Sequence, residues 1–229
     1  MDVRVDRAST GTMWTYGLGS IAVGIKNNLL GTYLLLYYNQ VLEVNALLVT
    51  AALFIALMID AFTDPMVGIW SDRVRSKWGR RHPFMYAAII PFAFSYYYIL
   101  QDPGNLSQTE HFVRLVFLMF ILRLSMTFYE IPRGALAPEL TKDYDQRTQI
   151  SGIGMALGWI GGAGIDYIYR AYYLGESFLN KEAYAEMAFL GGLGIFISTV
   201  ITTLGTHKHI PSLHKPPERK FEWKTFPAN

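Results

Sequence analysis

The sequence predicts an all-α membrane protein with six transmembrane helices. The 229 residues are 52% hydrophobic and only 17% charged, whereas an average soluble domain has about 25% charged residues. The apolar residues gather into runs of about 20, the length that a helix needs to cross roughly 30 Å of hydrocarbon. The Lys and Arg residues gather on alternate connections between these runs, as in membrane proteins that obey the positive-inside rule.

Composition also excludes several classes of function. The chain has no Cys, which rules out disulfides, thiol catalysis and zinc or iron–sulfur sites with Cys ligands. A net charge of +2 is too small to argue for a nucleic-acid partner. The high apolar content argues against a disordered chain.

Six apolar runs give the predicted helices, in the order Met13–Tyr38, Ala46–Trp70, Pro83–Leu100, Phe112–Arg133, Gln149–Leu174 and Tyr184–Thr206. None shows the sustained period of two that is typical of a β-strand. The first run is too long for a signal peptide and has no small-residue cleavage site after it. The fifth run carries Gly154, Gly158 and Gly162 at i, i+4 and i+8, which predicts close packing against a neighbouring helix.

The basic residues predict the orientation of the chain. One side holds most of the 20 Lys and Arg residues: Arg4, Arg7, Arg73, Arg75, Lys77, Arg80, Arg81, Arg133, Lys142, Arg147, Lys208, Lys215, Arg219, Lys220 and Lys224. The opposite connections are mainly acidic, and Lys181 is their only clear basic residue. The positive-inside rule then places both termini in the cytoplasm. We expect a multi-pass protein of the cytoplasmic (inner) membrane, surrounded by membrane lipid.

Charged residues inside the runs are the most informative, because each costs roughly 2.5–3.5 kcal/mol at the centre of a membrane helix. In the second run, Asp60, Thr63 and Asp64 lie three and four residues apart and therefore share one helical face. Pro65 follows and leaves the carbonyl of Ala61 without its helical partner. Oxygen ligands of this kind suit hard cations such as Na⁺, by extension from Ca²⁺ and Mg²⁺, and two adjacent carboxylates can also hold a proton instead. The alternative is that both Asp residues pair with basic residues of neighbouring helices.

A second polar face lies in the fourth run, where Arg123, Thr127 and Glu130 occupy positions i, i+4 and i+7. Glu130 is a candidate for completing a cation site or for accepting a hydrogen bond from a substrate hydroxyl. Arg123 is a candidate for binding an anionic substrate, or it pairs with Asp60 or Glu130.

The first run adds polar residues near its middle. Asn27 and Asn28 offer donors and acceptors that suit a polyhydroxylated solute, or they bond to another helix. Lys26 is a candidate substrate ligand or a counter-ion for the carboxylates of the second run.

The connection after the second run combines glycines with charges of both signs: Gly68, Asp72, Arg73, Gly79, Arg80 and Arg81. Glycine permits close packing, and the Asp carboxylate can accept hydrogen bonds from Arg side chains. We expect a conformational latch here, with a merely solvated run of charges as the alternative.

Four segments, in this order and spacing, resemble the glycoside–pentoside–hexuronide:cation symporter family of the major facilitator superfamily, to which melibiose permease belongs. They are YGLG with the later tyrosines of the first helix (Tyr16–Gly19, Tyr33–Tyr38), DAFTDPMVG (Asp60–Gly68), SDR with GRR and PF (Ser71–Phe84), and EIPRGALAPELT with its continuation (Glu130–Thr148). The similarity spans nearly the whole chain.

The resemblance implies roles for individual residues. In that family the acidic pair of the second helix binds the coupling Na⁺, Li⁺ or H⁺, which implies this role for Asp60 and Asp64, with Thr63 and Thr127 beside them. Glu130 stands where the family has its sugar-binding acid, as Glu in place of Asp. Three other sugar-binding positions depart: an acid falls on Gly24, an Arg on Met155 and a Trp on Gly134. We therefore expect a retained cation site and a different solute site, formed by Lys26, Asn27, Asn28, Arg123 and Glu130.

Family members have twelve spans in two halves, with the substrate between them. The resemblance implies that residues 1–206 form the N-terminal six-helix half and that residues 207–229 form a cytoplasmic linker. We expect an incomplete chain whose partner is a C-terminal six-helix half. A self-assembling half-transporter is the less favoured alternative.

The leading functional hypothesis is secondary active transport: symport of a sugar, sugar acid or sugar-like solute with Na⁺ or H⁺ (Li⁺ being possible), by alternating access. It implies no enzyme activity and no cofactor beyond the coupling cation. One alternative is a membrane transferase in which Asp60, Asp64 and Asp72 hold Mg²⁺ on a diphosphate substrate, although their spacing fits such enzymes poorly. The other is a lipid carrier of the same fold.

Overall fold

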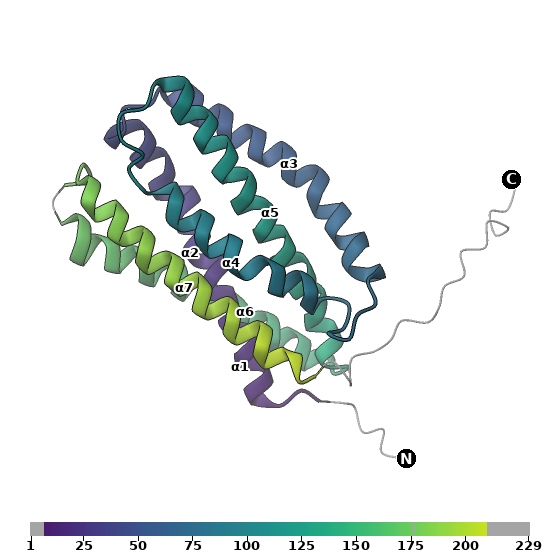
Figure 1. The fold of residues 1–229 in the computed structure, drawn as a ribbon. Coiled ribbons are helices and arrows are strands. Elements are labelled where there is room, and N and C mark those ends of the chain that lie inside the picture. Colours follow the sequence, from purple (N-terminus) through teal and green to yellow (C-terminus); the bar gives the residue numbers. More distant parts are fainter. Residues whose placement is uncertain (1–6, 176, 210–229) are drawn as a thin grey trace, which may run out of the picture.

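The computed structural model describes residues 7–175 and 177–209, which form a bundle of long helices (Figure 1). In chain order the elements are α1 (Thr10–Leu18), α2 (Ser20–Asn28), the π-helices η1 (Leu29–Tyr33) and η2 (Leu36–Val41), α3 (Ala46–Arg73), α4 (His82–Ile99), α5 (Gln108–Leu140), α6 (Tyr144–Ile168), the π-helix η3 (Tyr169–Leu174) and α7 (Lys181–His207). These residues contain no strand. The all-α prediction is therefore confirmed for the described part of the chain.

The first predicted helix is interrupted at Gly19, which separates α1 from α2. A Cβ atom at this position would lie 2.9 Å from Nε of Arg133 and would also overlap Tyr129 and Thr202. The close approach of these side chains to the backbone therefore requires glycine.

The fourth predicted helix is longer than expected. It begins at a capping box formed by Ser107 and Glu110 and continues through Pro132 and Pro138 to Leu140. Arg133, which we expected to flank the following connection, is instead inside the helix and only 7% exposed. The expectation was wrong because a proline in a long helix need not end it when neighbouring helices hold the backbone in place.

Asp143 is the N-cap of the next helix, α6. Its carboxylate accepts hydrogen bonds from the backbone N–H groups of Asp145 and Gln146. The bond from Gln146 and the ion pair with Arg7 (3.0 Å) hold the pKa of Asp143 below its usual value. This cap ends the short connection from α5 and fixes where α6 enters the bundle.

Helix packing brings the polar faces together. Helix α5 lies between α3 and α4, α2 packs along α6, and α7 contacts α1, α2 and α4 (Figure 1). The glycines on α2 and α6 allow the closest of these contacts: a Cβ on Gly24 would overlap the backbone of Gly158, and one on Gly161 would lie 2.8 Å from Cα of Ile21. Backbone contact between α2 and α6 sets the shape of the space beside them.

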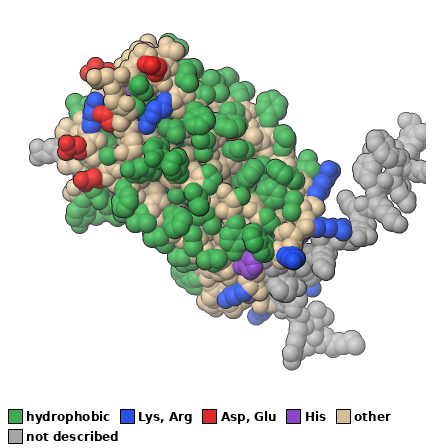
Figure 2. Space-filling model, viewed as in Figure 1, with side chains coloured by type: hydrophobic (Ala, Val, Ile, Leu, Met, Phe, Trp, Pro, Cys, Tyr) green, Lys and Arg blue, Asp and Glu red, His purple; other side chains and the backbone are tan. Residues whose placement is uncertain are grey.

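On the face shown in Figure 2, an apolar band lies between two polar ends. In Figure 2, Asp and Glu side chains gather at one end of the visible face, Lys and Arg predominate at the other, and hydrophobic side chains lie between. By length and composition, α3, α5 and α7 are apolar enough to cross a membrane. The first predicted span is divided into helical segments of nine residues and fewer, and the count of six spans stays a prediction.

Candidate functional site

Two carboxylates of α3 face polar side chains of α5. The Oδ2 atom of Asp60 lies 2.7 Å from Nη1 of Arg123, and both side chains are only 13% exposed. One turn further along, the hydroxyl of Thr127 donates a hydrogen bond of 2.7 Å to Oδ1 of Asp64. The i, i+4 spacing on both helices produces these two parallel contacts.

The two carboxylates differ in charge compensation. Asp60 has the guanidinium of Arg123, whereas within the described part of the chain Asp64 has no basic partner. Oδ1 of Asp60 and Oγ1 of Thr63 are buried and have no hydrogen-bond partner among the same residues. A buried oxygen without a partner is costly, so this cluster has the oxygen ligands and the residual negative charge to bind one monovalent cation.

Lys26 on α2 and Glu130 on α5 form a separate ion pair. Nζ of Lys26 lies 3.1 Å from Oε1 of Glu130 and 2.9 Å from the sulfur of Met126. The Lys26 side chain is 6% exposed and that of Glu130 is 27% exposed. Lys26 therefore neutralises Glu130, rather than contacting the α3 carboxylates.

A cavity of about 760 Å³ lies between α2, α5 and α6. This volume is within the range of small-molecule sites. Its lining consists of Tyr16, Ser20, Val23, Gly24, Asn27, Asn28, Thr32, Glu130, Arg133, Ile150, Ser151, Gly154, Met155, Gly158, Trp159, Gly162, Ala163, Asp166 and Arg170.

The cavity includes some of the predicted solute ligands and not others. Asn27, Asn28 and Glu130 line it, whereas Lys26 and Arg123 do not. Of the positions that depart from the family pattern, Gly24 and Met155 line the cavity and Gly134 does not.

Sequence reasoning missed three charged residues of this cavity: Arg133, Asp166 and Arg170. Asp166 and Arg170 are charged residues inside a predicted span, at i and i+4, and the same cost of burial could have identified them. Arg133 is the last residue of its apolar run, so we assigned it to the basic connection that follows and not to the membrane helix.

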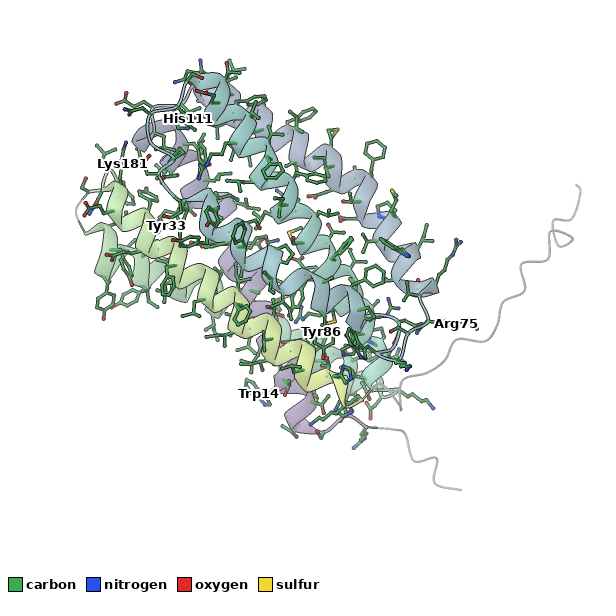
Figure 3. The ribbon with its side chains drawn as sticks, viewed as in Figure 1. Trp14, Tyr33, Arg75, Tyr86, His111 and Lys181 are labelled. Atoms are coloured by element: carbon green, nitrogen blue, oxygen red, sulfur yellow. The ribbon has the colours of Figure 1, made fainter. Side chains whose placement is uncertain are left out.

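Asp166 is held by donors from two helical segments. Its carboxylate accepts hydrogen bonds from the hydroxyl of Tyr33 (2.7 Å), Nδ2 of Asn28 (3.3 Å) and Nε of Arg170 (2.9 Å). In Figure 3, Tyr33 lies inside the bundle towards the end that carries His111 and Lys181, while Arg75 marks the opposite end. The Asp166 cluster therefore forms one end of the cavity and joins α6 to the α2–η1 segment.

The predicted latch residues form ion pairs at the end of the bundle marked by Arg75. Arg81 contacts Asp72 (2.8 Å), and both Arg81 (2.9 Å) and Arg80 (2.8 Å) contact the same oxygen of Glu139 on α5. Glu139, which the sequence did not single out as a latch residue, therefore joins the α3–α4 connection to α5.

Three other latch residues have smaller structural roles. Gly79 has φ +77°, a conformation that favours glycine. A Cβ on Gly68 would make only an ordinary contact with Ile131. Arg73 forms no ion pair within the part of the chain that the structure describes.

The position of Asp72 excludes the shared magnesium site of the transferase hypothesis. Asp72 follows Asp60 by twelve residues on the same helix, which is about 18 Å along the axis. Three carboxylates at such separations cannot bind one metal ion.

Comparison with known proteins agrees with the earlier resemblance. The sequence model of the family described as MFS/sugar transport protein matches residues 15–227. An uncharacterized symporter of Synechocystis sp. is 34% identical over 82% of this chain and 35% of its own length. The isoprimeverose transporter of Lactiplantibacillus pentosus is 24% identical (87% of this chain, 42% of its own), and the glucuronide carrier protein homolog of Escherichia coli is 27% identical (75% and 36%). The chain thus spans about 35–42% of the length of these relatives.

Proposed function

Because this chain belongs to the MFS/sugar transport protein family, we propose that it is part of a secondary transporter that carries a sugar or sugar-like solute together with Na⁺ or H⁺. The relatives are named as symporters, transporters and carriers and not as enzymes. Transport needs no chemical step, so the cavity has to bind and release its solute unchanged.

The observation that carries this proposal is the cavity between α2, α5 and α6, whose lining combines apolar with polar and charged side chains. Asn27, Asn28 and Glu130 supply amide and carboxylate groups that can hydrogen-bond several hydroxyls of one solute. Trp159, which also lines the cavity, is 75% exposed and offers an aromatic surface. This combination suits a polyhydroxylated ring.

Cation coupling is supported by the charge balance between α3 and α5. Asp64 is a carboxylate without a basic partner among the described residues, beside the unpaired hydroxyl of Thr63 and the free Oδ1 of Asp60. We assign Asp60, Thr63, Asp64 and Thr127 to the coupling cation. A cation there would remove the cost of a buried negative charge, and it stabilises the conformation in which these oxygens are closest.

The membrane arrangement is part of the same proposal. α1 with α2, η1 and η2 would form one span, α6 with η3 another, and α3, α4, α5 and α7 would form the other four. The basic end would face the cytoplasm and the molecule would lie in the inner membrane. A second six-helix half would complete the cavity, reached through a linker at residues 207–229, of which 210–229 lie outside the described residues.

The latch is the proposed moving contact. Ion pairs of Arg80 and Arg81 with Glu139 and Asp72 tie the α3–α4 connection to α5. We propose that these pairs break and reform as the two halves rock around the solute.

The proposal is tested by Asp64→Asn in the full-length protein, reconstituted into liposomes. The probes are radiolabelled isoprimeverose and a glucuronide, each driven by a Na⁺ or a proton gradient. Asn keeps the shape of Asp64 and removes its charge, so we expect cation-driven uptake to fall at least tenfold while exchange without a gradient persists. Asp145→Asn, an exposed carboxylate outside the site, is the matched control. Unchanged cation-driven uptake in Asp64→Asn would show that the cation assignment is wrong.

A further inference from the structure

The cavity is lined by two acidic and two basic side chains, and Lys26 contacts one of the acids from outside the lining. Glu130 is paired with Lys26, and Asp166 is paired with Arg170. Arg133 is the remaining charged group of the lining, and within the described part of the chain it forms no ion pair. Because Lys26 already compensates Glu130, the lining together with Lys26 has one positive charge in excess, that of Arg133.

Arg133 is positioned by neutral groups. Its Nη2 atom donates hydrogen bonds to the backbone carbonyl of Tyr16 (3.0 Å) and to Oγ of Ser20 (2.5 Å), and its guanidinium stacks over the Tyr16 ring at 4.4 Å. These contacts hold the side chain in place without neutralising it. The guanidinium is thus preorganised on the cavity wall.

Burial makes the missing anion significant. Arg133 is 7% exposed, and its Nε atom is buried with no hydrogen-bond partner among the described residues. A buried guanidinium is normally paired with a carboxylate or phosphate, because removing an unpaired charge from water is costly. A Cβ at position 154 would lie 3.1 Å from Oγ of Ser20 and 3.8 Å from Nη2 of Arg133, so glycine leaves room on this side of α6.

The two basic residues first assigned to an anionic solute are already engaged. Arg123 contacts Asp60 and Lys26 contacts Glu130. An anionic group that enters the cavity therefore meets one basic side chain with free donors at this end, and that side chain is Arg133.

We propose that Arg133 is the anion-binding residue of the cavity and selects solutes that carry a carboxylate. This inference rests on the proposed transport function and defines the solute as a sugar acid. The carboxylate binds Nη1 of Arg133, because Nη2 is already bonded to Tyr16 and Ser20 and Nε is buried beside Gly19. The ring hydroxyls face Asn27 and Asn28. Ser20 and Asn28 are eight residues apart on α2, about 12 Å along the helix, which is enough for one or two sugar rings.

The test compares two solutes that differ only at one carbon: methyl β-D-glucuronide, which has a carboxylate, and methyl β-D-glucoside, which has a hydroxymethyl group. Binding to the full-length protein in detergent is followed by Trp fluorescence and by the rise in unfolding temperature, and uptake is followed in liposomes. The variants are Arg133→Gln and Arg133→Lys. Arg147→Gln serves as control, because it removes an equal charge that bonds a backbone carbonyl outside the cavity.

We expect the wild-type protein to bind the glucuronide at least about 30-fold more tightly than the glucoside. This is the difference in affinity that one hydrogen bond between charged groups typically provides. Arg133→Gln should abolish this ratio, Arg133→Lys should restore part of it, and Arg147→Gln should keep it. A cooperative unfolding transition without solute shows that each variant is folded, and the shift of that transition on adding glucuronide reports binding without transport.

Three outcomes would overturn the inference, and they differ from failure of the transport proposal. Uptake of both solutes with no preference would show that Arg133 does not select a carboxylate, while transport itself stands. Loss of the preference in Arg133→Gln and Arg147→Gln alike would indicate a general charge effect. A rise in unfolding temperature with lysophosphatidylcholine but not with the glucuronide would show that Arg133 binds a lipid phosphate and not a sugar carboxylate. Absence of uptake and binding for both sugars would instead contradict the proposed function as a whole.

Discussion

At the scale of single residues, the middle of the bundle contains charges that compensate one another in pairs. Arg123 neutralises Asp60, Lys26 neutralises Glu130, and Asp64 has only the hydroxyl of Thr127. In a low-dielectric environment each pair matters because either member alone would be a buried, uncompensated charge. Arg123 therefore limits the cation site to one positive charge.

Removal of Arg123 should destabilise the protein and make it dependent on an added cation. We expect Arg123→Gln to lower the free energy of unfolding by about 2–4 kcal/mol, slightly less than for a fully buried pair because both side chains are 13% exposed. Sodium chloride should restore more stability in this variant than in the wild-type protein, because Asp60 then joins Asp64 as an unpaired carboxylate.

The measurement is thermal unfolding in detergent, with choline chloride at equal ionic strength as the control for screening. An equal response to sodium in both proteins would contradict the role of Arg123 as an internal counter-ion.

At the scale of elements, α2 and α6 are positioned by glycine. Gly154, Gly158 and Gly162 line the cavity, while Gly161 faces the backbone of Ile21. Gly158 and Gly162 of the predicted stripe pack closely against the backbone of Gly24, and Gly161 makes a second tight contact with α2. Backbone contact of this kind brings Asn28 within reach of Asp166.

Two substitutions on the same helix separate packing from helix propensity. Gly161→Ala would put a Cβ 2.8 Å from Cα and O of Ile21, whereas nothing lies within 4 Å of a Cβ at Gly164. We expect Gly161→Ala to destabilise by about 1–3 kcal/mol, and Gly164→Ala to be neutral or stabilising by up to about 1 kcal/mol, since Ala favours helix over Gly. Thermal unfolding of both variants checks the prediction. A loss of similar size at both positions would mean that the α2–α6 contact is not tight.

At the scale of the whole molecule, the latch connects elements that are far apart in the sequence. Glu139 at the end of α5 contacts both Arg80 and Arg81 before α4, and Arg81 also contacts Asp72 on α3. These contacts differ in burial: the Glu139 side chain is 14% exposed and that of Asp72 is 58% exposed. Most of the energetic link between the three helices should therefore pass through Glu139.

Substitution of each acid by its amide tests this difference. Glu139→Gln removes the buried negative charge that both Arg80 and Arg81 contact, and we expect a loss of about 2–3 kcal/mol together with slower solute uptake. Asp72→Asn, which removes an exposed partner of the same Arg81, should cost less than about 1 kcal/mol. Unfolding temperature and initial uptake rate are the measurements. Equal effects of the two variants would show that burial does not set the strength of the latch.

Much of the fold followed from local features of the sequence. Apolar length, charge asymmetry and helical spacing predicted the helical class, the approximate helix positions and the shared face of Asp60, Thr63 and Asp64. The error at Arg133 has a local cause, because the apolar run ended there and a connection was the simplest continuation. Asp166 and Arg170 were overlooked although they lie inside a predicted span.

The sequence by itself determined which residues are expensive to bury, because the cost of a charge in the membrane and the spacing of a helix are properties of the residue and its near neighbours. Only the tertiary structure decided which charges meet. Arg123 could pair with Asp60 or Glu130, and Lys26 could face either helix, until the packing of α2, α3 and α5 joined Arg123 to Asp60 and Lys26 to Glu130. The same packing left Arg133 on the cavity wall without a carboxylate, because an ion pair depends on the distance between helices and not on position along the chain.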